Sequence, residues 1–104
     1  MTQIYNVVID GVIDDRAHGE EHFGTILLGA SDGNYGTNYP DSMTNITVSN
    51  VISYAKSAIS VSGYLRDSVI TNVVNNNPNC EAVTVDRENG IINVKISNIV
   101  TTQK

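Results

Sequence analysis

A seven-residue pattern that recurs four times constrains the fold of this chain more than any other feature. The copies span residues 6–12, 45–51, 67–73 and 93–99. Each copy opens on Asn or Asp, alternates broadly between apolar and polar residues, and places a polar residue or Gly before a closing β-branched residue. The starts of the last three copies, at positions 45, 67 and 93, have a spacing typical of proteins built from stacked repeats. The pattern therefore predicts equivalent layers of chain lying one on another.

A second recurring element lies between these copies, at residues 25–29, 58–63 and 82–86. Two strands per layer, joined by short polar corners, are the components of a parallel β-helix, in which alternate residues fill the interior. Val and Ile far outnumber Leu, which occurs only three times, and this bias favours strands because β-branched side chains suit a pleated surface. We therefore predict an all-β fold: a right-handed single-stranded parallel β-helix (a solenoid) of about four rungs, forming one domain over residues 1–104.

The alternation also predicts which side chains form ladders and which face the interior. Asn50, Asn72 and Asn98 share one register, with Gly11 in the first rung, and we expect an asparagine ladder there. The run of Asn and Pro at residues 75–79 is expected to form a turn. Inward-facing positions are predicted at Val7, Ile9, Val12, Ile26, Leu28, Ile46, Val48, Val51, Ile59, Val61, Ile70, Val73, Val83, Val85, Val94, Ile96 and Ile99.

The first rung carries two insertions that the later rungs lack. The stretch from the start of the copy to the second strand is longer in the first rung, at 6–25, than in the next two, at 45–58 and 67–82. The return from the second strand to the next copy is also longer there, at 25–45, against 58–67 and 82–93. Enlarged loops are therefore predicted at residues 13–23 and 30–42. Insertions in repeat proteins map to loops on one face, often the binding face, so we expect the functional residues in these two loops.

The residue types in the two predicted loops suit carbohydrate, because Tyr rings stack on sugars while Asp and Asn bond hydroxyl groups. Glycoside hydrolysis needs two carboxyl groups across one bond. Adjacent residues of an extended strand point to opposite faces, so a catalytic pair would have to combine different loops. The catalytic candidates are Asp14, Asp15 and Asp32. The ligand-binding candidates are His18, Glu21, His22, Tyr35 and Tyr39.

Residues 18–22 match the H-x-x-E-H zinc pattern by letter. That chemistry requires both histidines on one helical face and a third ligand, whereas Gly19 interrupts the segment and no helical periodicity flanks it. We predict no metal site and no cofactor. The net charge is −5 and the six basic residues form no cluster, so neither nucleic acid nor a membrane is an expected partner.

The copies N-I-T-V-S-N-V at 45–51 and N-V-K-I-S-N-I at 93–99 resemble rungs of the pectin-lyase-like superfamily. This group of right-handed parallel β-helices includes polygalacturonases, pectate lyases and phage tailspike proteins. The stretch from Gly24 through Val51 is most similar to the polygalacturonase-type branch. That branch spreads its catalytic motifs over successive rungs, whereas Asp14-Asp15 and His18-Gly19 share one predicted loop here, and Asn-Thr-Asp and Arg-x-Lys are absent. The resemblance therefore implies the fold and no catalytic residues.

These observations favour a carbohydrate-associated β-helix domain that is non-catalytic on its own and contacts a polysaccharide or oligosaccharide at the rung-one loops. Two alternatives stay open: a polygalacturonase-like fragment of a glycoside hydrolase or lyase, and a structural oligomerisation module of a tailspike or adhesin. Because a rung stack exposes backbone and apolar interior at both ends, we expect a homo-oligomer or the continuation of a larger chain. The expected location is extracellular or at the cell surface.

Overall fold

The computed structural model describes residues 4–18, 24–29, 42–78, 80–86 and 90–101. The prediction of an all-β fold is confirmed for this part of the chain. Its seven strands are β1 (Ile4–His18), β2 (Ile26–Gly29), β3 (Met43–Ala55), β4 (Ser57–Ser62), β5 (Leu65–Asn75), β6 (Glu81–Val85) and β7 (Ile91–Thr101).

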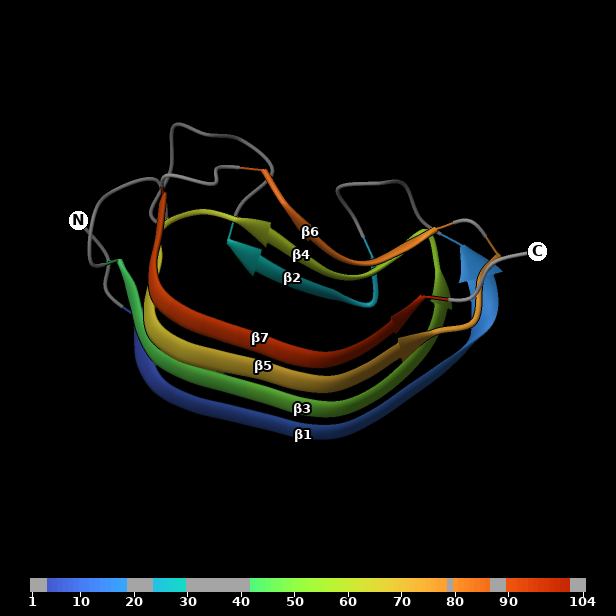
Figure 1. The fold of residues 1–104 in the computed structure, drawn as a ribbon, viewed down its shortest axis with the longest axis horizontal. Coiled ribbons are helices and arrows are strands. Elements are labelled where there is room, and N and C mark those ends of the chain that lie inside the picture. The colour runs from blue at the N-terminus through green and yellow to red at the C-terminus, as the bar shows by residue number, and fades with distance from the viewer. Residues whose placement is uncertain (1–3, 19–23, 30–41, 79, 87–89, 102–104) are drawn as a thin grey trace.

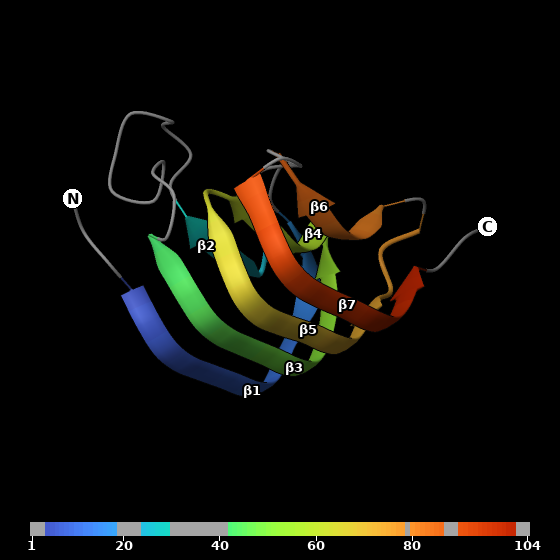
Figure 2. The same ribbon diagram turned by 60° about the vertical axis from the view of Figure 1, so that its left-hand side comes forward.

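The strands form two parallel sheets that lie opposite each other (Figure 1). The long strands stand in the order β1-β3-β5-β7, and the short strands in the order β2-β4-β6. The chain alternates between the sheets, so each short strand follows a long strand of the other sheet. Only Lys56 separates β3 from β4. Figure 2 shows the long strands as successive layers of one stack, and we call one long strand with the short strand that follows it a repeat.

The four copies of the sequence pattern lie in β1, β3, β5 and β7, and the second recurring elements lie in β2, β4 and β6. Both sets of predicted strands are confirmed. The copies also pair in matching register: Val12 lies opposite Val51, Val51 opposite Val73, and Val73 opposite Ile99. The identical position in each copy therefore forms one row across the long sheet.

Residues with a left-handed backbone stand at two fixed positions of every copy. Asn tolerates this conformation better than other residues that carry a Cβ, which explains why the pattern retains it. The first position holds Asn6, Asn45, Asp67 and Asn93, with φ between 53° and 59°. The sixth position holds Gly11, Asn50, Asn72 and Asn98, with φ of 82°, 57°, 56° and 52°.

Side chains of a strand normally face inward at every second position, and each left-handed residue moves the next inward position one residue further along. On β3 the buried apolar side chains Met43, Ile46, Val48 and Val51 follow one another at steps of three, two and three positions. A regular strand would keep steps of two. The long strands bend sharply along their length (Figure 1), so the two left-handed positions divide each strand into straight segments that wrap around one interior.

The apolar core fills the space between the two sheets. The predicted inward positions are in the core or packed against it, with one exception. Ile96 lies opposite Ile70 as predicted but is 37% exposed, because it belongs to the edge strand β7. The core also contains Met43, Ala58, Leu65 and Ala82.

Ser68 is a buried polar residue in a row of β-branched residues. It lies opposite Val94, and its Oγ is 3.0 Å from the backbone nitrogen of Ile46. This hydroxyl accepts a hydrogen bond from Ile46 and donates one to the carbonyl oxygen of Arg66 at 2.9 Å. The regular pairing of β3 with β5 is interrupted at this point. The Ser68 hydroxyl therefore accepts the hydrogen bond of the Ile46 backbone N–H in place of a strand carbonyl.

Gly24 lies where the chain meets the start of β4. A Cβ on Gly24 would overlap the carbonyl oxygen of Ser57. The backbone nitrogen of Thr25 donates a hydrogen bond to that same oxygen at 3.2 Å. The contact aligns β2 with β4 and requires glycine for steric reasons.

Candidate functional site

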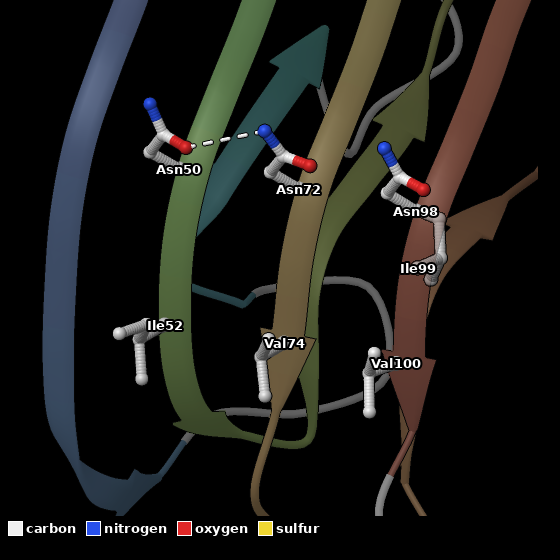
Figure 3. A pocket seen from close by; sticks show the side chains of 7 residues that line it. All are labelled: Asn50, Ile52, Asn72, Val74, Asn98, Ile99 and Val100. Atoms are coloured by element: carbon white, nitrogen blue, oxygen red, sulfur yellow. Dashed lines mark hydrogen bonds between the residues drawn. The ribbon is translucent and has the colours of Figure 1, made fainter.

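An open groove of about 450 Å³ lies on the outer face of the long sheet. It follows the second bend of β3, β5 and β7, where the left-handed asparagines stand (Figure 3). The groove is lined by amide and aliphatic side chains: Asn50, Ile52, Asn72, Val74, Asn98, Ile99 and Val100.

The asparagine side chains form one wall of the groove, and their hydrogen bonds share a direction. Asn50 donates from Nδ2 to Oδ1 of Asp10 at 2.7 Å, and Asn72 donates from Nδ2 to Oδ1 of Asn50 at 3.3 Å. Asn98 stands beside Asn72 with its nitrogen toward that neighbour and its oxygen away from it (Figure 3). The predicted ladder is thus confirmed for Asn50 and Asn72, and it starts from the carboxylate of Asp10.

Aliphatic side chains form the second wall. Ile52 lies opposite Val74, and Val74 opposite Val100. Ile52 is 44% exposed and Val100 is 51% exposed. The row continues at Ile13 on β1, which lies opposite Ile52. The result is a band of β-branched side chains that runs across all four long strands and faces solvent.

Tyr54 extends the aliphatic wall along β3. It follows Ile52 by two positions and therefore lies on the same face of the strand, and it is 39% exposed. Its carbonyl oxygen accepts a hydrogen bond from Nδ2 of Asn77 at 2.8 Å. Tyr54 is therefore a partly exposed aromatic residue on the same strand face as Ile52, and Asn77 holds its backbone in place.

A row of hydroxyl groups lies on the other side of the asparagines. Ser49 donates a hydrogen bond to Oδ1 of Asp10 at 3.2 Å, and the hydroxyls of Thr71 and Ser97 are 3.1 Å apart. Aliphatic, amide and hydroxyl groups therefore run as parallel rows over this face. Together they offer hydrogen-bond donors, acceptors and apolar contact within one surface.

The predicted loop at residues 13–23 needs correction in its first part. β1 continues through His18, so residues 13–18 are strand. The extra length is accommodated between Asp14, opposite Ser53, and His18, opposite Ala55. The chain advances four residues on β1 where β3 advances two. This irregularity is a bulge, and it accommodates part of the insertion inside the sheet.

The two candidate carboxylates on β1 have different environments. Asp14 is half-buried, and its Oδ2 accepts a hydrogen bond from Oγ1 of Thr25 at 2.7 Å. That hydroxyl is also 2.7 Å from Oγ of Ser53. Asp15 is exposed. Asp14 is consequently part of a polar network that joins β1, β3 and the start of β2, and the structure does not bring Asp14 and Asp15 to one point.

The remaining predicted site residues, Glu21, His22, Asp32, Tyr35 and Tyr39, lie outside the described residues, as does most of the predicted loop at 30–42. Ser42, the last residue of that predicted loop, is buried. The sequence interpretation missed the aliphatic wall. Its signal was a β-branched residue directly after each copy, at Ile13, Ile52, Val74 and Val100.

The carboxyl group of Asp67 has a pKa below its ordinary value. The amide of Asn93, which donates from Nδ2 to Oδ1 at 2.7 Å, does most to hold the pKa of Asp67 below its ordinary value. The guanidinium of Arg66, 3.2 Å from Oδ2, acts in the same direction. Asp67 belongs to the row of copy-opening residues, in which Asn45 likewise donates to Oδ1 of Asn6 at 2.7 Å.

The described residues contain no cluster of three or more His, Cys, Asp or Glu side chains arranged to hold a metal ion. In the same part of the chain, no helix has the length and apolar character needed to cross a membrane. Comparison with protein-family models, with curated proteins and with solved structures found no match to this chain.

Proposed function

We propose that this chain is a right-handed parallel β-helix domain that binds carbohydrate on its outer face and is non-catalytic on its own. The β-helix interpretation is supported by the alternation of the chain between two parallel sheets and by corners as short as Lys56. Parallel crossovers are overwhelmingly right-handed. The rung pattern of the pectin-lyase-like superfamily, which the copies resemble, agrees with this interpretation.

The observation that carries the proposed function is the composition of the groove. Its lining pairs asparagine amides, each a donor and an acceptor, with aliphatic side chains, of which Ile52 and Val100 are exposed. Sugar rings present hydroxyl edges and apolar C–H faces, and these two walls complement them. The lining residues carry no charge, which favours a neutral glycan over an acidic one.

The direction of the groove also suits a chain-like ligand. Equivalent side chains recur from strand to strand along the stack, at the spacing of neighbouring strands, about 4.8 Å. A polysaccharide that lies across β3, β5 and β7 would meet the same pair of groups at each strand. Tyr54, at the end of the aliphatic wall on β3, supplies a ring for stacking on one sugar.

The non-catalytic part of the proposal rests on the same residues. Glycoside hydrolysis uses two carboxyl groups on either side of the scissile bond, and the groove lining contains none. The predicted ligand contacts at His18, which ends β1, and at Tyr35 are a second proposed contact region. Such a domain would act outside the cell or at its surface, within or beside a larger carbohydrate-active protein.

The test is titration of the ¹⁵N-labelled chain with neutral and with acidic oligosaccharides, followed by NMR. We expect neutral oligosaccharides to shift the side-chain amide signals of Asn50, Asn72 and Asn98. Ile52→Lys should weaken this binding about tenfold or more, because it places a charged chain in an apolar wall. Thr47→Lys, on the outer face of the same strand but away from the groove, is the matched control.

Three results would contradict the proposal. Shifts confined to residues outside the groove would place the ligand elsewhere. Binding of acidic oligosaccharides alone would contradict the choice of a neutral glycan. New reducing ends released from a polysaccharide by the purified chain would contradict the non-catalytic part.

A further inference from the structure

The two ends of the stack expose the same rows of apolar side chains. Interior members of these rows are fully covered: Ile46, Val48 and Val51 on β3 are at most 2% exposed. Members on the edge strands β1 and β7 are only half-buried, and Ile96 is 37% exposed. These edge members are Val7, Ile9 and Val12 on β1, and Val94, Ile96 and Ile99 on β7.

The short sheet repeats this arrangement. Val83 and Val85 on β6 and Ile26 on β2 are half-buried, whereas Ile59 and Val61 on the middle strand β4 are at most 1% exposed. Within the part of the chain that the structure describes, each end of the stack therefore lacks one covering layer over both sheets. Among the described strands, β1 pairs only with β3, and β7 only with β5. The outer edge of each of these two strands therefore presents backbone N–H and C=O groups that another strand could pair with.

The side-chain ladders give the two ends opposite hydrogen-bonding character. At the first position of the copies, Asn45 donates to Asn6, and Asn93 donates to Asp67. In each pair the amide donates toward the β1 end of the stack. The oxygen of Asn93 therefore faces outward beyond β7, and the nitrogen of Asn6 faces outward beyond β1. One end presents an acceptor and the other presents a donor, at the same row.

The charges at the two ends are also opposite. Lys95 is the only charged residue of β7, and it occupies the row of Val69, Thr47 and Val8. If β7 paired with β1 of another copy in the register used inside the chain, Lys95 would lie opposite Val8 and diagonal to Asp10. Diagonal neighbours are within reach of long side chains on one face of a sheet.

From these observations we propose that copies of this chain bind head to tail, with β7 of one copy against β1 of the next. The register continues that of the interior strands, so Val94, Ile96 and Ile99 cover Val7, Ile9 and Val12. The partner is a second copy of this chain, selected by matching rows, by the donor–acceptor pair of Asn6 and Asn93, and by Lys95 with Asp10. Because this contact uses two different surfaces, it leaves one free end of each kind and extends into longer assemblies. The inference does not rest on the proposed glycan binding, although Ile99 belongs both to this interface and to the lining of the groove.

The experiment uses two variants that each block one end. Ile9→Lys charges the β1 end and Ile96→Lys the β7 end. Light scattering on a size-exclusion column should show wild-type mass rising with concentration above that of the 11.2 kDa chain. Each variant alone should stay monomeric at every concentration. An equimolar mixture should form a one-to-one dimer that grows no further, because it joins the two intact ends and leaves the two blocked ones outside.

Ile52→Lys is the matched control, because it makes the same change on the outer face of an interior strand. It should assemble like the wild type while losing glycan binding, which separates failure of this inference from failure of the proposed function. Circular dichroism confirms that each variant keeps the wild-type strand content. Lys95→Glu, at an exposed position, offers a second test: it should weaken assembly about fivefold or more, and added salt should partly restore it.

A wild-type chain that stays monomeric at the highest soluble concentration would overturn the proposal, and would assign the two edges to a different occupant. An assembling wild type whose two blocked variants fail to combine would also overturn it, in favour of an interface between like surfaces. Assembly that is unchanged in Lys95→Glu at low salt would refute the proposed register.

Discussion

Asn72 donates a hydrogen bond from its Nδ2 to Oδ1 of Asn50, 3.3 Å away on the neighbouring strand, while both residues hold a left-handed backbone. One residue type thus satisfies two requirements at the same position. Its backbone tolerates the bend, and its amide links successive layers. A substitution at this row changes both properties, and a pair of variants can separate them.

Asn72→Ala and Asn72→Gly should destabilise the chain to different extents. Alanine loses the amide ladder, worth about 1 kcal/mol, and also carries the left-handed penalty of about 1–2 kcal/mol. Glycine avoids the left-handed penalty, but it loses the ladder and adds unfolded-chain freedom worth about 0.5–1 kcal/mol. The free energy of unfolding, measured by urea denaturation, should therefore fall further in Asn72→Ala. Equal losses would mean that the left-handed penalty of alanine does not exceed the entropic cost of glycine.

Gly11 is the one glycine in the row of left-handed asparagines, with a φ of 82° and open space around its missing side chain. Gly11→Asn should be neutral or stabilising by up to about 1 kcal/mol, because it restricts the unfolded chain at a position that asparagine tolerates. Gly11→Ala should be destabilising by about 1 kcal/mol or more, because alanine is unfavourable in the left-handed conformation. Thermal denaturation of the two variants in parallel is the check, and the reverse order of stability would contradict the row as described.

Gly24→Ala should be more damaging than Gly11→Ala, although its backbone is not left-handed. The added methyl group would overlap the carbonyl oxygen of Ser57 and would displace the start of β2 from β4. We expect a loss of about 3 kcal/mol or more, at the upper end for single substitutions. Hydrogen exchange should localise the damage to β2 and β4, and a loss spread evenly over β5 and β7 would argue against this cause.

Asp67 should make stability depend on acidity. Its pKa is held below the ordinary value by Asn93 and Arg66, so the ionised form is favoured in the folded state. The contribution is fully present above the unfolded-state pKa of about 4 and is lost as pH falls through the lower folded pKa. Urea unfolding between pH 5 and pH 2 should show a smaller pH dependence in Asp67→Asn than in the wild type. If the free energy of unfolding changed equally with pH in the wild type and in Asp67→Asn, the contacts of Asn93 and Arg66 would not stabilise the ionised form of Asp67.

Asn75 is fully buried, and its amide connects three backbone groups. Nδ2 donates to the carbonyl oxygens of Ala55 and Glu81 at 3.0 and 2.8 Å, and Oδ1 accepts from the nitrogen of Asn77 at 2.9 Å. Asn75→Asp keeps the shape but faces two carbonyl oxygens with another acceptor. We expect a loss of about 3 kcal/mol or more at neutral pH. The deficit should shrink as pH falls and the new carboxyl group becomes protonated, whereas a pH-independent deficit would contradict the hydrogen-bond account.

The sequence predicted the strands because the repeat encodes them locally. Alternation at Ile46 and Val48, and the recurrence of Asn at the sixth position, identify rows without any knowledge of tertiary contacts. Asn75 shows the limit of that reasoning. A run of Asn with Pro is typical of a turn, yet Asn75 ends β5 and is buried, because β6 returns over it and offers the carbonyl of Glu81. Such a role depends on a partner segment that no local pattern specifies.

The candidate site was harder to predict for a similar reason. The insertions drew attention to residues 13–23, where Asp14 and Asp15 were candidates for a catalytic pair with a residue of another loop. The bulge in β1 makes part of that length strand instead, and Asp14 accepts a hydrogen bond from Thr25. The groove arises from Ile52 and Val74, which a hydrophobic pattern taken alone would assign to the interior. Ile52 and Val74 face outward because the left-handed residue two positions before each of them shifts the inward–outward alternation by one position.

The left-handed positions also determine how a chain of this kind can change its length. Removing one residue between Ile46 and Val51 would turn the following side chains to the opposite face until the next bend. Removing the whole segment from Asn45 through Arg66 would instead join the chain at Asp67, which opens an equivalent copy. Point deletions are therefore destructive, while loss or duplication of a complete repeat leaves every row intact, so whole repeats are the unit in which evolution, or a protein engineer, can edit the size of this molecule.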